Sequence, residues 1–204
     1  MAGRGRLVAL EGIDGCGKST QTRLLADRLG ALATVEPGAT ALGAALRRLL
    51  LDPDLPPLSP RAEALLMAAD RAEHVDELLA PALAAGRWVV TDRYSGSTIA
   101  FQGHGRGLEL DGLHGLVDWA TAGLAADLAV VVDVPLEVAR ARLGASRPDR
   151  LEGLDEGFHA RVREGFLAQA EADPAHWAVV DGTAPVGEVA EAVHRAVLSR
   201  LGQP

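Results

Sequence analysis

The sequence has one cysteine and six histidines among its 204 residues. A single cysteine, Cys16, excludes an intramolecular disulfide bond and the paired cysteines of a zinc finger. The histidines show no His-x-x-x-His spacing that would place two metal ligands on one helix face. The sequence therefore predicts no structural metal site.

Long apolar runs are also absent. Residues 1–6 are short and basic, and the apolar run after them ends at Leu10, which is too short for a signal peptide or a membrane span. We therefore expect a cytoplasmic protein without a membrane partner. The net charge of -8 argues against broad binding to nucleic acid, because that affinity depends on basic surface that neutralises phosphates.

Lysine is almost missing. Of the 20 basic residues, one is a lysine, Lys18, and the others are arginines. In a chain that uses arginine elsewhere, this lysine indicates a place where a compact ammonium fits and a planar guanidinium does not. Because the chain is acidic overall, an anionic ligand must meet such a local basic site.

The order of the predicted elements indicates an α/β fold. Apolar runs that favour strands alternate with longer segments of helical periodicity, and this alternation predicts a parallel sheet. The runs are apolar on both faces, which is typical of a sheet covered by helices on each side. We expect a single domain over residues 1–204, a three-layer α/β/α sandwich around a parallel sheet with five strands at 7–10, 33–36, 88–91, 128–133 and 177–181.

Two later segments have distinct patterns. Valines recur at roughly helical spacing near the C-terminus and predict a helix with one buried face, formed by Val186, Val189, Val193 and Val197. Residues 144–157 lie between two helical patterns and are rich in arginine and acidic residues. We expect this second segment to form a mobile lid.

Residues 12–19 match the Walker A pattern of a phosphate loop, and they lie after a predicted strand and before a predicted helix at 20–29, as such a loop requires. Its glycines allow backbone N–H groups to surround phosphate oxygens, and the helix N-terminus adds a favourable dipole. We expect Lys18 to reach the outer phosphates of ATP and Ser19 to bind Mg2+. The expected nucleotide contacts are Gly12, Ile13, Asp14, Gly15, Cys16, Gly17, Lys18, Ser19 and Thr20.

Asp92 follows the predicted strand 88–91, at the sheet edge that also carries the phosphate loop. A carboxylate at this position is placed to bind Mg2+ or its coordinated water. A helix N-cap is the alternative role, because a helical segment follows. Arg93 comes directly after Asp92 and supplies a partner for an anion.

The chain resembles the thymidylate kinase family along nearly its whole length. Five segments match that family's pattern in order: 10–21, 36–40, 69–74, 92–103 and 149–152. The resemblance implies a P-loop nucleoside monophosphate kinase that uses ATP and Mg2+ to phosphorylate thymidylate. It also implies a homodimer that contacts itself through helices flanking the sheet.

The resemblance assigns the acceptor site. Asp14 would hold the 3′-hydroxyl of the sugar, while Arg71 and Arg93 would hold the acceptor phosphate through paired hydrogen bonds. Thr98 would lie against the thymine edge. For the arginines and for Thr98, a solvated helix surface is the alternative. The other residues expected at the acceptor are Glu36, Met67, Phe101 and Gln102.

The resemblance also assigns the lid. Position 15 is glycine, and family members without an arginine in the phosphate loop place a catalytic arginine in the lid. Arg147 and Arg150 are the candidates, three residues apart and so on one face of a helical turn. Arg142 would stack on adenine or bind phosphate, and residues 181–185 would touch adenine. A plain solvated loop is the alternative. The catalytic residues that we expect are Lys18, Arg93, Arg147 and Arg150.

Three positions depart from the family pattern. Val35 stands where an arginine is usual, and Phe101 replaces a common tyrosine. Met67 stands where an aromatic ring commonly stacks on thymine, and methionine covers a base with a polarizable but less specific surface. Core packing is the alternative for Met67. These departures leave open another pyrimidine monophosphate as the acceptor.

A regulatory P-loop switch is the alternative from a different class. The chain contains no Asn-Lys-x-Asp sequence that would read guanine, since Lys18 is the only lysine. The arginine-rich lid favours a kinase. Cys16 within the loop is either a redox-sensitive thiol near Lys18 or a small spacer residue, and the spacer role is the simpler expectation.

Overall fold

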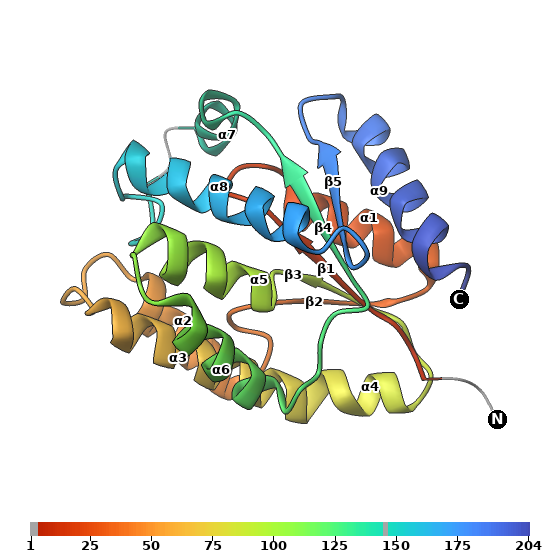
Figure 1. The fold of residues 1–204 in the computed structure, drawn as a ribbon, viewed down its shortest axis with the longest axis horizontal. Coiled ribbons are helices and arrows are strands. Elements are labelled where there is room, and N and C mark those ends of the chain that lie inside the picture. Colours follow the sequence, from red (N-terminus) through yellow and green to blue (C-terminus); the bar gives the residue numbers. More distant parts are fainter. Residues whose placement is uncertain (1–3, 145–146) are drawn as a thin grey trace.

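The computed structural model describes residues 4–144 and 147–204, so residues 145 and 146 of the expected lid lie outside the described residues. Five parallel strands form one sheet in the order β2-β3-β1-β4-β5 (Figure 1). The predicted strands are confirmed to within one residue at each end. Their bounds are β1 (Leu7–Glu11), β2 (Leu32–Val35), β3 (Val89–Asp92), β4 (Leu128–Asp133) and β5 (Trp177–Asp181).

Helices cover both faces of the sheet, which confirms the predicted sandwich (Figure 1). On one face, α1 (Lys18–Leu29) packs beside α9 (Val186–Leu201). On the other face, η1 (Val75–Leu79), a π-helical segment, and α4 (Ala80–Ala84) contribute to the apolar cluster beneath β1 and β3. The remaining helices are α2 (Ala41–Leu51), α3 (Pro60–His74), α5 (Ser95–Thr98), π-helical η2 (Ile99–Gly105), α6 (Leu110–Thr121), α7 (Leu136–Leu143) and α8 (Glu156–Ala172).

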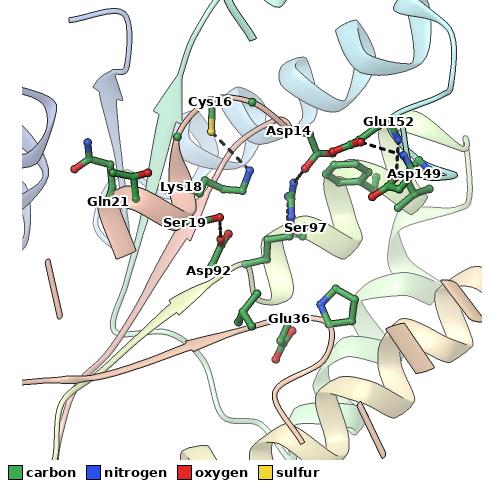
Figure 2. A pocket seen from close by; sticks show the side chains of 18 of the residues that line it. Asp14, Cys16, Lys18, Ser19, Gln21, Glu36, Asp92, Ser97, Asp149 and Glu152 are labelled. Atoms are coloured by element: carbon green, nitrogen blue, oxygen red, sulfur yellow. Dashed lines mark hydrogen bonds and ion pairs between the residues drawn. The ribbon is translucent and has the colours of Figure 1, made fainter. Parts of the chain in front are cut away.

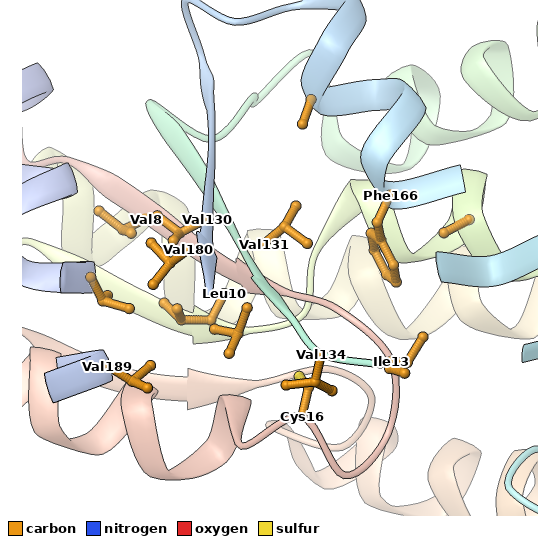
Figure 3. Packing of buried hydrophobic residues seen from close by; sticks show 14 of the residues in the cluster. Val8, Leu10, Ile13, Cys16, Val130, Val131, Val134, Phe166, Val180 and Val189 are labelled. Carbon is orange, nitrogen blue, oxygen red and sulfur yellow. The ribbon is translucent and has the colours of Figure 1, made fainter. Parts of the chain in front are cut away.

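The central strand β1 is buried on both faces, and its side chains alternate between two apolar clusters. Val8 and Leu10 join the larger cluster, which includes α1 and α9 residues such as Val189 (Figure 3). Leu7 and Ala9 join the second cluster. The same alternation places the last residue of β1, Glu11, on the face of the sheet that carries the second cluster.

The C-terminal helix α9 buries a narrower face than the valine spacing predicts. Val189, Val193 and Val197 are buried, whereas Val186 in the first turn is 57% exposed. Within the described stretches, no helix is both long enough and apolar enough to cross a membrane.

The strand order positions the site. Because β1 lies between β3 and β4, the loop that leaves its carboxyl end lies between the ends of two neighbouring strands. In open α/β sheets, such a switch in strand order opens a crevice where ligands bind.

Candidate active site

Glycine is required within the loop between β1 and α1. Gly15 has a φ of 79° and Gly12 a φ of 136°, in the region that side chains disfavour. A Cβ atom on Gly15 would lie only 2.3 Å from the carbonyl oxygen of Ala139 in α7. Position 15 therefore cannot carry an arginine unless α7 moves.

Lys18 folds back over this loop. Its side chain is 5% exposed, and its Nζ donates a hydrogen bond of 2.9 Å to the carbonyl oxygen of Ile13. Ile13 itself contributes its side chain to the core. The ammonium is thus held beside the backbone that a bound phosphate would approach (Figure 2).

The hydroxyl of Ser19 donates to Asp92 Oδ2 at 2.5 Å, which joins the start of α1 to the end of β3. Asp92 does not cap a helix, because the residue that precedes α5 is Tyr94. The N-cap alternative is therefore wrong. A hydroxyl beside a carboxylate is a set of hard oxygen ligands that fits Mg2+. Among the described residues, no group of three or more His, Cys, Asp or Glu side chains could hold a metal without further ligands.

A cavity of about 670 Å³ connects the expected donor and acceptor residues. Figure 2 shows Lys18, Ser19 and Asp92 on one side of it and Asp149 and Glu152 on another. The expected site residues that line it are Asp14, Gly15, Cys16, Gly17, Lys18, Ser19, Thr20, Glu36, Met67, Arg71, Asp92, Arg93, Thr98, Phe101, Gln102 and Arg142. The tertiary fold therefore brings together residues spread over most of the chain.

Arg93 and Asp14 form an ion pair at the phosphate-loop end of the cavity. Arg93 also donates to the carbonyl oxygen of Gly12 at 3.1 Å and to Ser97 Oγ at 3.0 Å. Its guanidinium carbon lies 4.8 Å from the ring centre of Phe101. Burial favours the neutral form of Asp14, but the charges of Arg93 and Lys18 hold its pKa below the usual value. The pair therefore stays ionised near neutral pH.

Arg71 lies deep in the fold at 2% exposure, so it is not on a solvated helix surface. Its Nε donates to Glu36 Oε2 at 2.8 Å, its Nη1 to Thr98 Oγ1 at 2.8 Å and its Nη2 to the carbonyl oxygen of Tyr94 at 2.9 Å. Glu36 also contacts His74 Nδ1 at 2.8 Å. A phosphate would have to compete with these bonds, and Thr98, buried at 2%, shares the same network.

The sequence-based prediction missed Ser97 and Arg47, which line the cavity, and also Glu63 and Arg106, which contact Gln102 or each other behind it. Glu63, 1% exposed on α3, accepts from Gln102 Nε2 at 2.9 Å and from Arg106 Nη2 at 2.7 Å. Because a carboxylate only accepts hydrogen bonds, the amide nitrogen of Gln102 faces Glu63 and its oxygen faces away. No helical i,i+4 pairing signals Ser97, because Arg93, four residues before it, has a φ of 73° and lies outside α5.

Arg142 connects the phosphate loop with the loop after β5. Its Nη1 donates to the carbonyl oxygen of Cys16 at 3.2 Å, and its Nη2 donates to that of Gly182 at 2.9 Å. This places a guanidinium between the two segments that were expected to contact the donor nucleotide.

Comparison with known proteins identifies the family. The sequence profile described as thymidylate kinase matches residues 10–193. This chain belongs to the thymidylate kinase family. Two family members from Synechococcus sp., strains CC9311 and RCC307, are 46% and 48% identical to it, over 96% and 97% of this chain and 97% and 98% of theirs.

A solved structure supports the same assignment. The crystal structure of thymidylate kinase from Ehrlichia chaffeensis superposes with a TM-score of 0.79 at 28% identity, covering 95% of this chain and 99% of that one. The resemblance inferred from the residues is therefore confirmed at the level of the family and the fold.

The two lid arginines expected from the family pattern do not share a helical face. Residues 147–149 are irregular, so that part of the expectation is wrong. Arg147 is 67% exposed and pairs with the exposed Asp54, at 2.5 Å from its Nη2. Arg150 Nη2 donates to the carbonyl oxygens of Asp52 and Leu55 at 2.9 and 3.1 Å. Neither arginine is among the described residues that line the cavity.

Other lid residues do reach the cavity. Asp149, Leu151 and Glu152 line it. Burial raises the pKa of Glu152, and a hydrogen bond from the backbone of Asp149 opposes the rise. In this arrangement the lid presents acidic side chains to the cavity while its arginines contact the segment at 49–55.

Met67 has features of both roles considered for it, contact with the acceptor base and core packing. It is partly buried against the main apolar cluster, and it also lines the cavity. Met67→Phe is expected to lower the KM for thymidylate about three- to tenfold, because an aromatic contact adds roughly 0.5–1.5 kcal/mol beyond area burial. The KM for ATP should not change.

A paired measurement of melting temperature and thymidylate KM tests this expectation. If Met67 belongs to the core, the larger ring costs about 1–3 kcal/mol of stability through overpacking. A lower melting temperature with an unchanged KM would therefore assign Met67 to the core. Leu65→Phe is a control on the same helix, because Leu65 is 59% exposed.

Proposed function

We propose that this chain is a thymidylate kinase that transfers the γ-phosphoryl group of ATP to dTMP, giving dTDP and ADP. One observation carries the proposal. Residues 14–19 of the phosphate loop, including Lys18, and the Asp14–Arg93 pair line the same cavity, in a chain whose match to the family covers residues 10–193.

Different residues along the cavity bind the donor nucleotide and the acceptor nucleotide. Lys18 and the backbone N–H groups of the loop bind the outer phosphates of ATP, and Arg142 holds the nucleotide beside the loop at 181–185. Arg93 binds the acceptor phosphate and Asp14 binds the 3′-hydroxyl. Phosphoryl transfer needs little covalent chemistry from a protein, so this positioning and charge neutralisation supply the rate.

Ser19 and Asp92 are the residues that would hold Mg2+. When bound there with the nucleotide, the ion neutralises charge on the phosphates. Ser19 would hold it from the start of α1 and Asp92 from the end of β3, directly or through water.

The acceptor base lies at the other end of the cavity, against Met67, Thr98 and Gln102, with Arg71, Glu36 and Phe101 beside it. The whole chain acts as one kinase domain, and the segment at about 144–157 is its lid. Lid closure excludes water from the reacting phosphates.

A coupled assay of ADP release tests the function. With ATP and Mg2+, dTMP should give the highest kcat/KM in a panel that includes dUMP, dCMP, UMP and dAMP. The 5-methyl group that distinguishes dTMP from dUMP is worth roughly 10- to 200-fold in a well-fitting pocket. Equal turnover of all pyrimidine monophosphates would show a pyrimidine monophosphate kinase without specificity for dTMP. ADP release that does not depend on any acceptor would contradict the proposed kinase activity.

The proposal includes a homodimer. Large apolar side chains are exposed on α6, namely Trp119 at 80% and Leu110 at 37%, and a contiguous exposed apolar patch marks an association site. Light scattering after size-exclusion chromatography should give twice the chain mass of 21.2 kDa.

A further inference from the structure

Glu11, the last residue of β1, is a carboxylate with no exposure to solvent. It receives hydrogen bonds from the backbone N–H groups of Tyr94 at 3.0 Å and Ser97 at 3.2 Å, both to Oε1. The hydroxyl of Ser97 donates to Oε2 at 2.6 Å. The carboxylate therefore occupies the N-terminus of the helical segment that begins with α5.

Ser97 continues this chain of hydrogen bonds to the acceptor-binding arginine. Its hydroxyl oxygen accepts from Arg93 Nη1 at 3.0 Å. An ionised carboxylate can only accept hydrogen bonds, so Ser97 must donate its one hydroxyl proton to Glu11. Its lone pairs then face Arg93, and the direction of donation runs from Arg93 through Ser97 to Glu11.

We propose that Glu11 is a positioning residue for the acceptor site: its ionised carboxylate fixes the Ser97 hydroxyl and, through it, the guanidinium of Arg93. The inference rests on the proposed function, because it takes Arg93 to be the group that binds the acceptor phosphate. Charge-assisted bonds of this kind are stronger than neutral ones and hold their partners more narrowly.

Close contacts around Glu11 restrict its side chain to this position. A Cβ atom on Gly96 would lie 3.1 Å from Glu11 Oε1 and 2.4 Å from the ring of Trp177, so the start of the helix rests closely on the carboxylate. Arg93, which it supports, has a φ of 73°, an uncommon conformation for a residue with a side chain. A residue held in that conformation needs fixed partners.

The protonation of Glu11 adds a pH dependence. Burial raises the pKa of Glu11 to about 7, although Ser97, Arg93, Tyr94 and Arg71 oppose the rise. Two charged groups act on it, Arg93 from the loop after β3 and Arg71 from α3. Below this pH the carboxyl group is protonated and donates to Ser97. The Ser97 hydroxyl proton then loses its acceptor, because the Arg93 guanidinium only donates, and the hold on Arg93 weakens.

The same raised pKa gives an independent stability test. The folded state binds the Glu11 proton more tightly than the unfolded state, so stability declines as pH rises from about 4.5 to about 7. Glu11→Gln removes a buried charge while keeping the shape. The variant should therefore melt at least as high as the wild type at pH 8.

The experiment compares Glu11→Gln and Ser97→Ala with wild type, with Ser95→Ala on the same helix as the matched control. At pH 8, both test variants should raise the KM for dTMP about tenfold, leave the KM for ATP unchanged and combine non-additively in the double variant. In the wild type, protonation of Glu11 should lower kcat/KM below pH 7, and Glu11→Gln should lack this contribution to the pH profile. The acceptor phosphate, with a pKa of about 6, contributes equally to all variants.

The outcomes are distinct. If the wild type phosphorylates dTMP but Glu11→Gln and Ser97→Ala keep its dTMP KM and pH profile, the positioning role is wrong and the proposed function stands. A parallel rise in the KM for ATP, or a lower melting temperature at pH 8, would make Glu11 merely structural. If the wild type prefers another monophosphate, the proposed function fails and the same comparison is made with that acceptor.

Discussion

Lys18→Ala is expected to abolish phosphoryl transfer, with kcat/KM falling on the order of 10^3 or more, because removing one preorganised donor at developing charge already costs about 10^2 to 10^3. The fold should survive. Nζ contacts the Ile13 carbonyl and the Cys16 sulfur, and the neutral variant no longer buries a charge. Coupled ADP release and thermal melting are the two measurements.

Lys18→Arg tests whether charge alone suffices. We expect it to be inactive as well, because the broad guanidinium has little room at a side chain only 5% exposed. Arg28→Ala is the matched control for loss of a basic residue on α1, since Arg28 pairs with Glu191 on the surface. Near wild-type turnover of Lys18→Ala would refute the phosphate-loop assignment.

The second large effect is expected in the lid. Arg147→Ala or Arg150→Ala should lower kcat more than it raises the KM for ATP, with a loss on the order of 10^3 for the residue that acts as an arginine finger. Position 15 of the phosphate loop has no space for an arginine unless α7 moves, given the 2.3 Å approach to Ala139. Steady-state kinetics of both variants separates kcat from KM.

Two controls accompany this prediction. Arg140→Ala removes an exposed arginine paired with Glu156 on the surface and should have little effect. Asp54→Ala releases Arg147 from its surface ion pair and should not lower kcat if that pair must open for catalysis. Small, equal effects of Arg147→Ala and Arg150→Ala that are confined to KM would reduce the lid to a nucleotide clamp.

Local patterns in the chain were enough for the framework of the site. The five strands followed from runs of apolar residues, and the phosphate loop followed from glycine and lysine spacing between a strand and a helix. These features are decided within about ten residues of sequence, so tertiary contacts leave them unchanged. The position of Asp92 at a strand end followed in the same way, and with it the proximity to Ser19.

The partners of each side chain were not accessible in this way. Arg71 could be assigned as a basic residue of the site, but its bonds to Glu36 and Thr98 join residues 35 and 27 positions away. The lid arginines illustrate the limit further, because their spacing predicts a shared helical face, whereas Arg147 lies in an irregular stretch and Arg150 in a turn, both against the segment at 49–55.

The sequence by itself determined the family, the order of the strands along the chain and the phosphate-loop pattern, since these depend on residue type and local spacing. The tertiary structure alone decided which polar groups are buried and what they bind. Glu11 shows the difference: in the sequence it is one acid before a glycine-rich loop. In the fold it loses all contact with water and meets Ser97 from a helix 86 residues away. Burial and long-range hydrogen bonding set its pKa and its role, and neither is encoded by its neighbours in the chain.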